Sequence, residues 1–321
     1  MFRIFGPPGT GKTTTLLNMV DEALDSGIHP HKIAFLAFTR KAANEARDRA
    51  AARFNLDPKK DLSYFRTLHS LALSLSNIRS EQVMQEEHYR ELSETIGVEV
   101  YSSTQVGAFE EDITTVTSNK NPILNVINLA RLRKVDLRDQ YNESTLDAPW
   151  NVVNYVATSL EAYKGNMGLY DFTDMLDEFI RSAPMTCPHF DLCFIDEAQD
   201  LSPLQWDLAH ILDENSTRTY CAGDDDQAIY RWAGADVDHF INLPGGSETL
   251  SQSYRVPRRV HAVAQTVASR INRRFPKRYE PKKEEGHVQT VAGIEYLDMS
   301  DGEWLILSQA GYMLQDAAAW L

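Results

Sequence analysis

The chain has 321 residues, of which 43% are hydrophobic and 24% charged, and this balance is typical of a globular protein with two or three domains. A net charge of −14 argues against binding nucleic acid through overall charge. The sequence has no apolar run of about 18 residues and no signal-peptide pattern at its start, which argues against a membrane or exported protein. Three cysteines are too few for a disulfide framework and favour a reducing cytoplasm.

The first predicted elements surround a phosphate-binding motif at the start of the chain. FRIF predicts a strand, TTTLLNMVDEAL predicts a helix, and the residues between them fit G-x-x-x-x-G-K-[ST]: Gly6, Pro7, Pro8, Gly9, Thr10, Gly11, Lys12 and Thr13. Glycines let backbone N–H groups close around phosphate oxygens at a helix N-terminus. We therefore predict a nucleotide-phosphate site that also includes Thr14, with Lys12 on the β- and γ-phosphates and the Thr13 hydroxyl on Mg²⁺.

The next elements alternate between strand and helix patterns. KIAFLAF (32–38) predicts a buried strand, residues 39–54 a helix, and residues 63–75 a strand end, a turn and a helix. Alternation of this kind indicates an α/β fold with a parallel sheet. The stretch 77–165 is mostly helical in pattern, as in LNVINLARLRKV (124–135) and WNVVNYVATSLEAYKG (150–165).

A pair of acids follows the apolar strand pattern in FDLCFIDEAQD, residues 190–200. A carboxylate at the end of a buried strand next to a P-loop strand can hold Mg²⁺, so Asp196 is a candidate metal ligand. Glu197 is then placed to orient and deprotonate an attacking water. The pair favours nucleotide hydrolysis over a small-molecule kinase, which would not need the second acid.

The strand pattern RTYCAGD (218–224) leads into GDDDQAIYRWAGAD, residues 223–236. Ligands of open α/β sheets bind beyond the carboxyl ends of the strands, so this segment, the acid pair and the P-loop are expected to meet at one nucleotide. Gln227 can then sense the γ-phosphate. Tyr230 and Trp232 offer faces on which bases stack.

The last part of the chain is locally basic. Residues 251–286 hold ten Lys or Arg against three Glu, which fits either a basic face or a solvated helix. HVQTVAG (287–293) and WLILS (304–308) predict strands after a polar connector at 276–286, and GYMLQDAAAWL (311–321) predicts a helix.

Six segments stand out along the chain: AFTRKAANEARDRA, FRTLHSLA, YDFTDMLDEFI, FIDEAQDLSPLQW, YCAGDDDQAIYRWAGAD and LSQSYRVPRRV. They occur in the order of the motifs of UvrD/Rep-like superfamily 1 helicases, and the chain resembles that family over residues 2–260. The resemblance implies a RecA-like P-loop NTPase domain with a parallel sheet (1–76 and 166–246), a helical insertion (77–165) and an incomplete second RecA-like domain (247–321). It also implies ATP, Mg²⁺ and single-stranded or junction DNA as ligands, and the cytoplasm or nucleoid of a bacterial or phage-infected cell.

The resemblance further implies roles for single residues. Asp196 and Glu197 match the Walker B acids, with Glu197 as catalytic base, and Gln227 matches the γ-phosphate sensor. Tyr254 matches the tyrosine that stacks on adenine, and Arg255 the arginine that reaches the γ-phosphate.

The residues that match single-stranded DNA contacts are Phe38, His69, Tyr230 and Trp232. Phe38 could equally be the last core residue of its strand, and His69 a satisfied histidine at a helix start.

The chain departs from the family in three places. A glutamine motif upstream of the P-loop, which reads adenine, is not present, Ala233 replaces the arginine of the family's RWRGA, and the later motifs of the second domain are missing before Leu321. Three explanations fit the missing motifs: a truncated chain, the product of a split gene that pairs with a second chain, and a degenerate or partial reading frame. The candidate functions are a DNA helicase or translocase with the family's 3′-to-5′ polarity, a DNA-binding ATPase without unwinding activity, and a RecB- or AddA-like recombination subunit.

Overall fold

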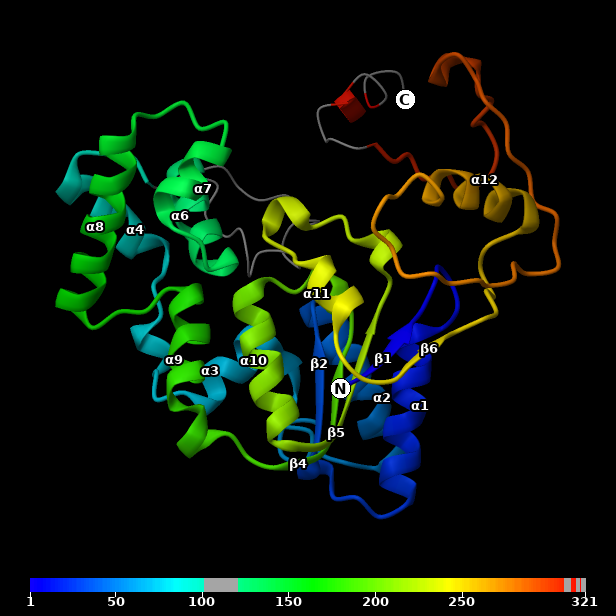
Figure 1. Ribbon diagram of the computed structural model, residues 1–321, viewed down its shortest axis with the longest axis horizontal. Helices are drawn as coiled ribbons and strands as arrows, with labels where there is room; N and C mark the ends of the chain where they lie inside the picture. The colour runs from blue at the N-terminus through cyan, green and yellow to red at the C-terminus, as the bar shows by residue number, and fades with distance from the viewer. Residues whose placement is uncertain (101–120, 309–312, 316–317, 319–321) are drawn as a thin grey trace.

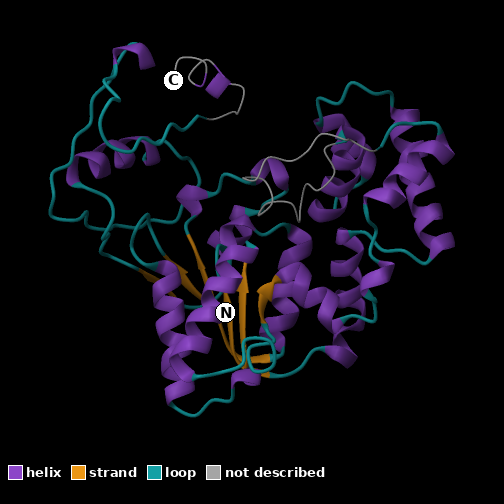
Figure 2. Ribbon diagram, turned by 180° about the vertical axis from the view of Figure 1, so that it is seen from behind, coloured by secondary structure: helices purple, strands orange, loops and turns teal. Residues whose placement is uncertain are grey.

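A computed structural model describes residues 1–100, 121–308, 313–315 and 318. Its centre is a six-stranded, all-parallel sheet with the strand order β3-β2-β4-β5-β1-β6 (Figures 1 and 2). The strands are β1 (Phe2–Phe5), β2 (Ile33–Ala37), β3 (Phe65–Thr67), β4 (Phe190–Ile195), β5 (Ser216–Gly223) and β6 (Ser247–Thr249). The predicted α/β class with a parallel sheet is therefore confirmed.

Helices cover both faces of this sheet, as Figure 2 shows with the strands in orange between helical layers. One face packs against α1 (Lys12–Asp25) and α2 (Arg40–Phe54). The other packs against α3 (Leu68–Leu75), α9 (Phe172–Thr186), α10 (Pro203–Glu214) and α11 (Val237–Asn242). Because both faces are covered, the central strands read as continuous apolar runs, and all five residues of β2 are buried.

The helical stretch predicted at 77–165 has a small core of its own. It contains α4 (Glu86–Ile96), α6 (Pro122–Arg133), α7 (Leu137–Glu143) and α8 (Trp150–Met167). The helices predicted from residues 124–135 and 150–165 are confirmed as α6 and α8. The N-terminus of α6 is capped by Asn121, whose side chain accepts hydrogen bonds from the N–H groups of Ile123 and Leu124. A proline in the first turn also favours a helix start at this position.

The segment after residue 246 begins inside the same sheet, because β6 pairs with β1. It continues through α12 (Arg258–Ala268), which lies on the other side of the molecule from the insertion in Figure 1. The strands predicted at 287–293 and 304–308 are wrong: neither pairs with a strand in the described part of the chain, and Leu305 and Leu307 are exposed. A strand pattern forms a strand only where a partner completes its hydrogen bonds.

The helix predicted for residues 311–321 lies largely outside the described residues. Among the helices that are described, none has the length and apolar character needed to cross a bilayer.

Candidate functional site

The predicted motifs meet at one edge of the sheet. The P-loop follows β1, Asp196 follows β4 and Asp224 follows β5, and these three strands are neighbours. Since all strands are parallel, their carboxyl ends lie together. The sequence correctly predicted this convergence.

The P-loop has the backbone that an anion site needs. Gly9 and Gly11 have φ values of 72° and 79°, in the left-handed region that favours glycine. A Cβ at Gly6 would lie 2.3 Å from Lys12 Cγ, so the lysine stem lies directly over that glycine. In the described structure no side chain caps α1 and no acid occupies its first turn, which leaves its N-terminal N–H groups available to phosphate.

Both predicted acids contact the P-loop helix. The Thr13 hydroxyl donates to Asp196 Oδ2 at 2.8 Å, and Lys12 Nζ forms an ion pair with Glu197 Oε2 at 3.0 Å. Asp196 is buried, and this burial, reinforced by the nearby Glu197 carboxylate, raises the pKa of Asp196. A hydroxyl and a carboxylate this close offer the oxygen ligands that Mg²⁺ prefers.

A glutamine that the sequence analysis did not single out connects these acids to the loop after β5. Gln199 Nε2 donates to Glu197 Oε2 at 2.8 Å and to Asp200 Oδ2 at 2.9 Å, while Gln199 Oε1 accepts from the Asp224 N–H at 3.0 Å. Glu197 itself has φ 54°, a conformation that costs a residue other than glycine about 1–3 kcal/mol. The network therefore fixes the candidate catalytic base in an unfavourable backbone geometry.

Gln227 lies in the same arrangement. Its Nε2 donates to Asp224 Oδ2 at 2.5 Å, and its side chain lines a cavity of about 300 Å³. The cavity is also lined by Thr13, Asp196, Glu197, Phe38 and Tyr230. Residues predicted for ATP and residues predicted for DNA thus face one cavity.

Three of the four predicted DNA contacts form a cluster of rings. Phe38 stacks on Tyr230 with ring centroids 5.4 Å apart, and the Tyr230 and Trp232 centroids are 6.3 Å apart. Trp232 is 57% exposed although it is a large apolar side chain. Exposed aromatic faces of this kind suit the stacking of bases.

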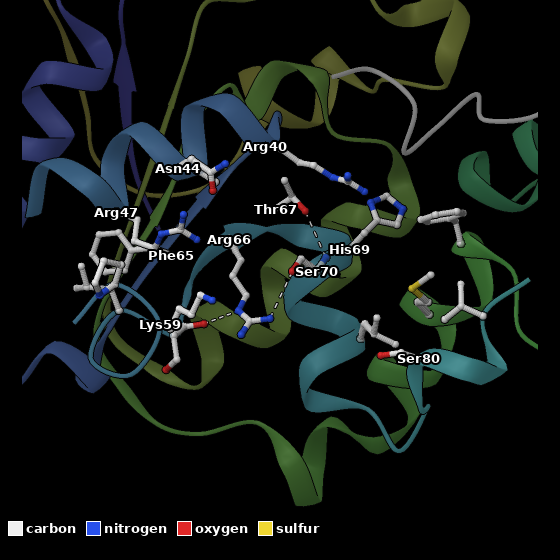
Figure 3. Close-up of a pocket in the computed structure, with 18 of the residues that line it drawn as sticks. Arg40, Asn44, Arg47, Lys59, Phe65, Arg66, Thr67, His69, Ser70 and Ser80 are labelled. Atoms are coloured by element: carbon white, nitrogen blue, oxygen red, sulfur yellow. Dashed lines mark hydrogen bonds between the residues drawn. The ribbon is translucent and has the colours of Figure 1, made fainter. Parts of the chain in front are cut away.

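His69 does not join this cluster. Its side chain is buried against Phe172, and burial lowers its pKa to about 4, so its ring is neutral at physiological pH. It lines a separate cavity of about 650 Å³, shown in Figure 3, where the exposed Arg40 extends toward it. The other polar residues labelled around this cavity include Asn44, Arg47, Lys59, Arg66 and Ser70.

The segment with Tyr254 and Arg255 docks on the P-loop. The Tyr254 N–H donates to the Gly9 carbonyl at 2.9 Å, and the Ser253 hydroxyl donates to the Pro8 carbonyl at 2.8 Å. A Cβ at Gly9 would lie 2.4 Å from Arg255 Cβ, so only glycine permits this approach. Tyr254 is 75% exposed and borders a cavity of about 510 Å³ with Thr10, Gly11 and Thr14, which has room for a base beside the phosphate site.

The structure adds residues that sequence reasoning missed, namely Gln199, Asp200 and Ser253. Gln199 and Asp200 stand in the quoted DEAQD segment, and their place two and three residues after Glu197 was the available signal. Ser253 gave no signal, since its contact with Pro8 spans 245 positions.

Comparison with known proteins gives a consistent picture. The family profile described as UvrD/REP helicase N-terminal domain matches residues 2–245. The chain is 27% identical over 290 residues to the ATP-dependent DNA helicase PcrA of Leuconostoc citreum, covering 86% of this chain and 38% of that protein. It is 27% identical over 304 residues to a protein named "Probable DNA helicase" of Mycoplasma pneumoniae, covering 84% of this chain and 53% of the relative. The chain thus spans about half or less of the length of these relatives.

Proposed function

Because the chain belongs to the UvrD/REP helicase family, we propose that it couples ATP hydrolysis to movement along single-stranded DNA, as part of an ATP-dependent DNA helicase. The observation that carries this proposal is the shared cavity, which Glu197 and Gln227 line together with Phe38 and Tyr230. In this arrangement, chemistry at the phosphate and contact with a base involve the same short loop.

Each residue of the ATP site has a defined task in this proposal. Lys12 and the N–H groups of the P-loop bind phosphate, and Tyr254 stacks on the base in the adjoining cavity. Glu197 accepts the proton of the attacking water, Gln227 contacts the γ-phosphate, and Arg255 approaches it from the docked segment.

Thr13 and Asp196 would hold Mg²⁺, because their oxygens already lie 2.8 Å apart. When bound, the ion would neutralise charge on the phosphates during transfer. The residues that surround it would orient the water and exclude competing solvent.

The DNA strand would run over the ring cluster. Phe38, Tyr230 and Trp232 would stack on bases without reading sequence, each ring contributing about 1–3 kcal/mol. His69 would contact the strand as a neutral residue from the separate cavity that it lines with Arg40. We also propose the 3′-to-5′ polarity that the family resemblance implies, and unwinding of tailed duplexes with either overhang would test it.

We also propose the domain division expected from the sequence: 1–76 and 166–246 as the first ATPase domain, 77–165 as its insertion, and 247–321 as part of the second domain. The separate core of the insertion supports this division. The pairing of β6 with β1 extends the first sheet to Thr249.

The test is ATP hydrolysis by the purified chain with and without single-stranded DNA, beside Glu197→Gln. The amide keeps the shape of the side chain and its contact with Gln199, but it cannot accept a proton. We expect DNA-stimulated turnover in the unaltered chain and almost none in the variant, with nucleotide binding retained. Equal turnover in both would refute the role of Glu197, and turnover that DNA does not affect would refute the coupling.

A further inference from the structure

The three aspartates of the GDDDQ segment are not a solvated loop. Asp224 and Asp225 are buried, and the side chain of Asp226 is only 12% exposed. Three buried carboxylates in succession repel one another and lose their hydration unless cations compensate them. The structure shows which cations do so.

Lys277 lies at the centre of these aspartates. Its ammonium contacts Asp224 Oδ1 at 3.0 Å, Asp225 Oδ1 at 2.5 Å and Asp226 Oδ2 at 3.0 Å, and its side chain is fully buried. Burial by itself lowers the pKa of this lysine, but the surrounding carboxylates outweigh that effect and raise it. The ammonium therefore stays charged.

Phe275, two positions before Lys277, anchors this part of the chain. The Phe275 ring stacks on Phe5, with centroids 3.8 Å apart and planes within 5°, and the Phe275 N–H donates to Asp225 Oδ2 at 2.7 Å. Phe5 is the last residue of β1, directly before the P-loop. This segment is thus anchored to the strand that carries the phosphate site.

Asp224 connects Lys277 to the nucleotide site in two directions. Its Oδ2 accepts from Gln227 Nε2, and its N–H donates to Gln199, which in turn holds Glu197. Among the described contacts, the one carboxylate that orients the predicted γ-phosphate sensor is therefore itself held by Lys277, 53 positions farther along the chain.

We propose that Lys277 is a positioning residue for ATP recognition: its ammonium holds Asp224 in the orientation that presents the Gln227 amide to the γ-phosphate. This inference rests on the proposed function, because it assumes that Gln227 contacts a γ-phosphate. It predicts that losing the ammonium impairs the discrimination of ATP from ADP and leaves the binding shared by both nucleotides intact.

A matched control lies in the same cluster. Arg274 forms two hydrogen bonds to the Asp226 carboxylate, at 2.8 and 2.5 Å, but none to the carboxylates of Asp224 or Asp225 among the described contacts. Arg274→Gln therefore removes a cation from the aspartates without touching the residue that orients Gln227. Its nucleotide preference should stay at the level of the unaltered chain.

The experiment measures the affinity of the chain for ADP and for a non-hydrolysable ATP analogue, using a fluorescent nucleotide. Hydrogen bonds to a charged group are strong enough that Lys277→Met should reduce the preference for the analogue by about tenfold, with ADP affinity nearly unchanged. Gln227→Ala should do the same. The double variant Lys277→Met/Gln227→Ala should be no worse than Gln227→Ala alone, because both changes remove one interaction.

A second variant guards against a chain that fails to fold. Lys277→Met/Asp225→Asn removes one negative charge together with the ammonium and keeps an oxygen for the Phe275 N–H. It should fold and still lack the preference.

Three outcomes are decisive. If Lys277→Met keeps the preference for the ATP analogue, the inference is overturned and the proposed function is not affected. If Lys277→Met does not fold, the same result in Lys277→Met/Asp225→Asn has this meaning. If the losses of nucleotide preference add up in Lys277→Met/Gln227→Ala, the inference is also overturned, since additive losses indicate a general structural role for Lys277. An unaltered chain with no preference for the ATP analogue refutes the proposed function and this inference with it.

Discussion

Asp200 offers the sharpest test of the electrostatics around the site. Its side chain is buried beside the acid pair, its Oδ1 has no hydrogen-bond partner among the described residues, and only Gln199 donates to its Oδ2. Burial, reinforced by the nearby Glu197 carboxylate, raises its pKa from 3.8 to about 7. Asp200→Asn replaces this acid by a neutral group of the same shape.

The sign follows from proton binding. Because the folded pKa exceeds the unfolded one, the folded state binds the proton more tightly, and the stabilisation is complete below the unfolded pKa and lost as the pH rises through about 7. Between about pH 5 and about pH 8.5 the loss amounts to roughly 2–3 kcal/mol for this shift. The asparagine variant has no such loss.

Urea unfolding of both proteins across that pH range would measure the difference, in the absence of nucleotide and metal. We expect the free energy of unfolding of Asp200→Asn to rise relative to the unaltered chain by about 2–3 kcal/mol from the acidic to the basic end. Other titrating groups cancel because both proteins contain them. A difference that does not change with pH would show that Asp200 is ionised throughout and would refute the reasoning.

Two further predictions concern the ring cluster and the insertion. Trp232→Ala should weaken binding of single-stranded DNA by about 1–3 kcal/mol in an anisotropy titration and leave thermal stability unchanged. Trp304→Ala, at a tryptophan of similar exposure, should change neither property, and equal affinities of the two variants for DNA would argue against stacking. Lys164→Met should lower the free energy of unfolding by up to about 3–5 kcal/mol, because the buried Asp171 carboxylate loses the ammonium 2.9 Å away and keeps only Arg131 as a cation among the described contacts. Arg258→Met breaks only an exposed pair and should cost less than about 1 kcal/mol, so similar losses in the two variants would contradict this reasoning.

The sequence allowed the site to be predicted where local pattern and topology agree. FRIF and FIDE each combine an apolar strand with chemistry at its end, and parallel strands bring those ends to one edge. The convergence of Lys12, Asp196 and Gln227 followed from that rule. Tyr230 and Trp232 stood out because two aromatics in a short polar loop have few structural uses, whereas the stacking of Phe38 on Tyr230 was not predicted.

The sequence could not predict contacts that depend on distant segments. The stretch 276–286 was interpreted as a polar connector, yet Lys277 is fully buried among aspartates some fifty positions earlier. Nothing local distinguishes a buried lysine from a solvated one. The predicted strands at 287–293 and 304–308 were wrong for the converse reason, since a local pattern there has no partner strand in the described part of the chain.

The order of strands in the sheet has a mechanical consequence. Phe38 follows β2 and the P-loop follows β1, and in the sheet only β4 and β5 lie between them. Three strand spacings of about 4.8 Å separate the two ends, or roughly 14 Å. Gln227 bonds to Asp224 after β5 and Tyr230 stacks on Phe38 after β2, so the short backbone between Gln227 and Tyr230 crosses part of that span. Inserting one residue between Gln227 and Tyr230 would displace these two side chains relative to each other, without changing a residue of the ATP site or of the ring cluster.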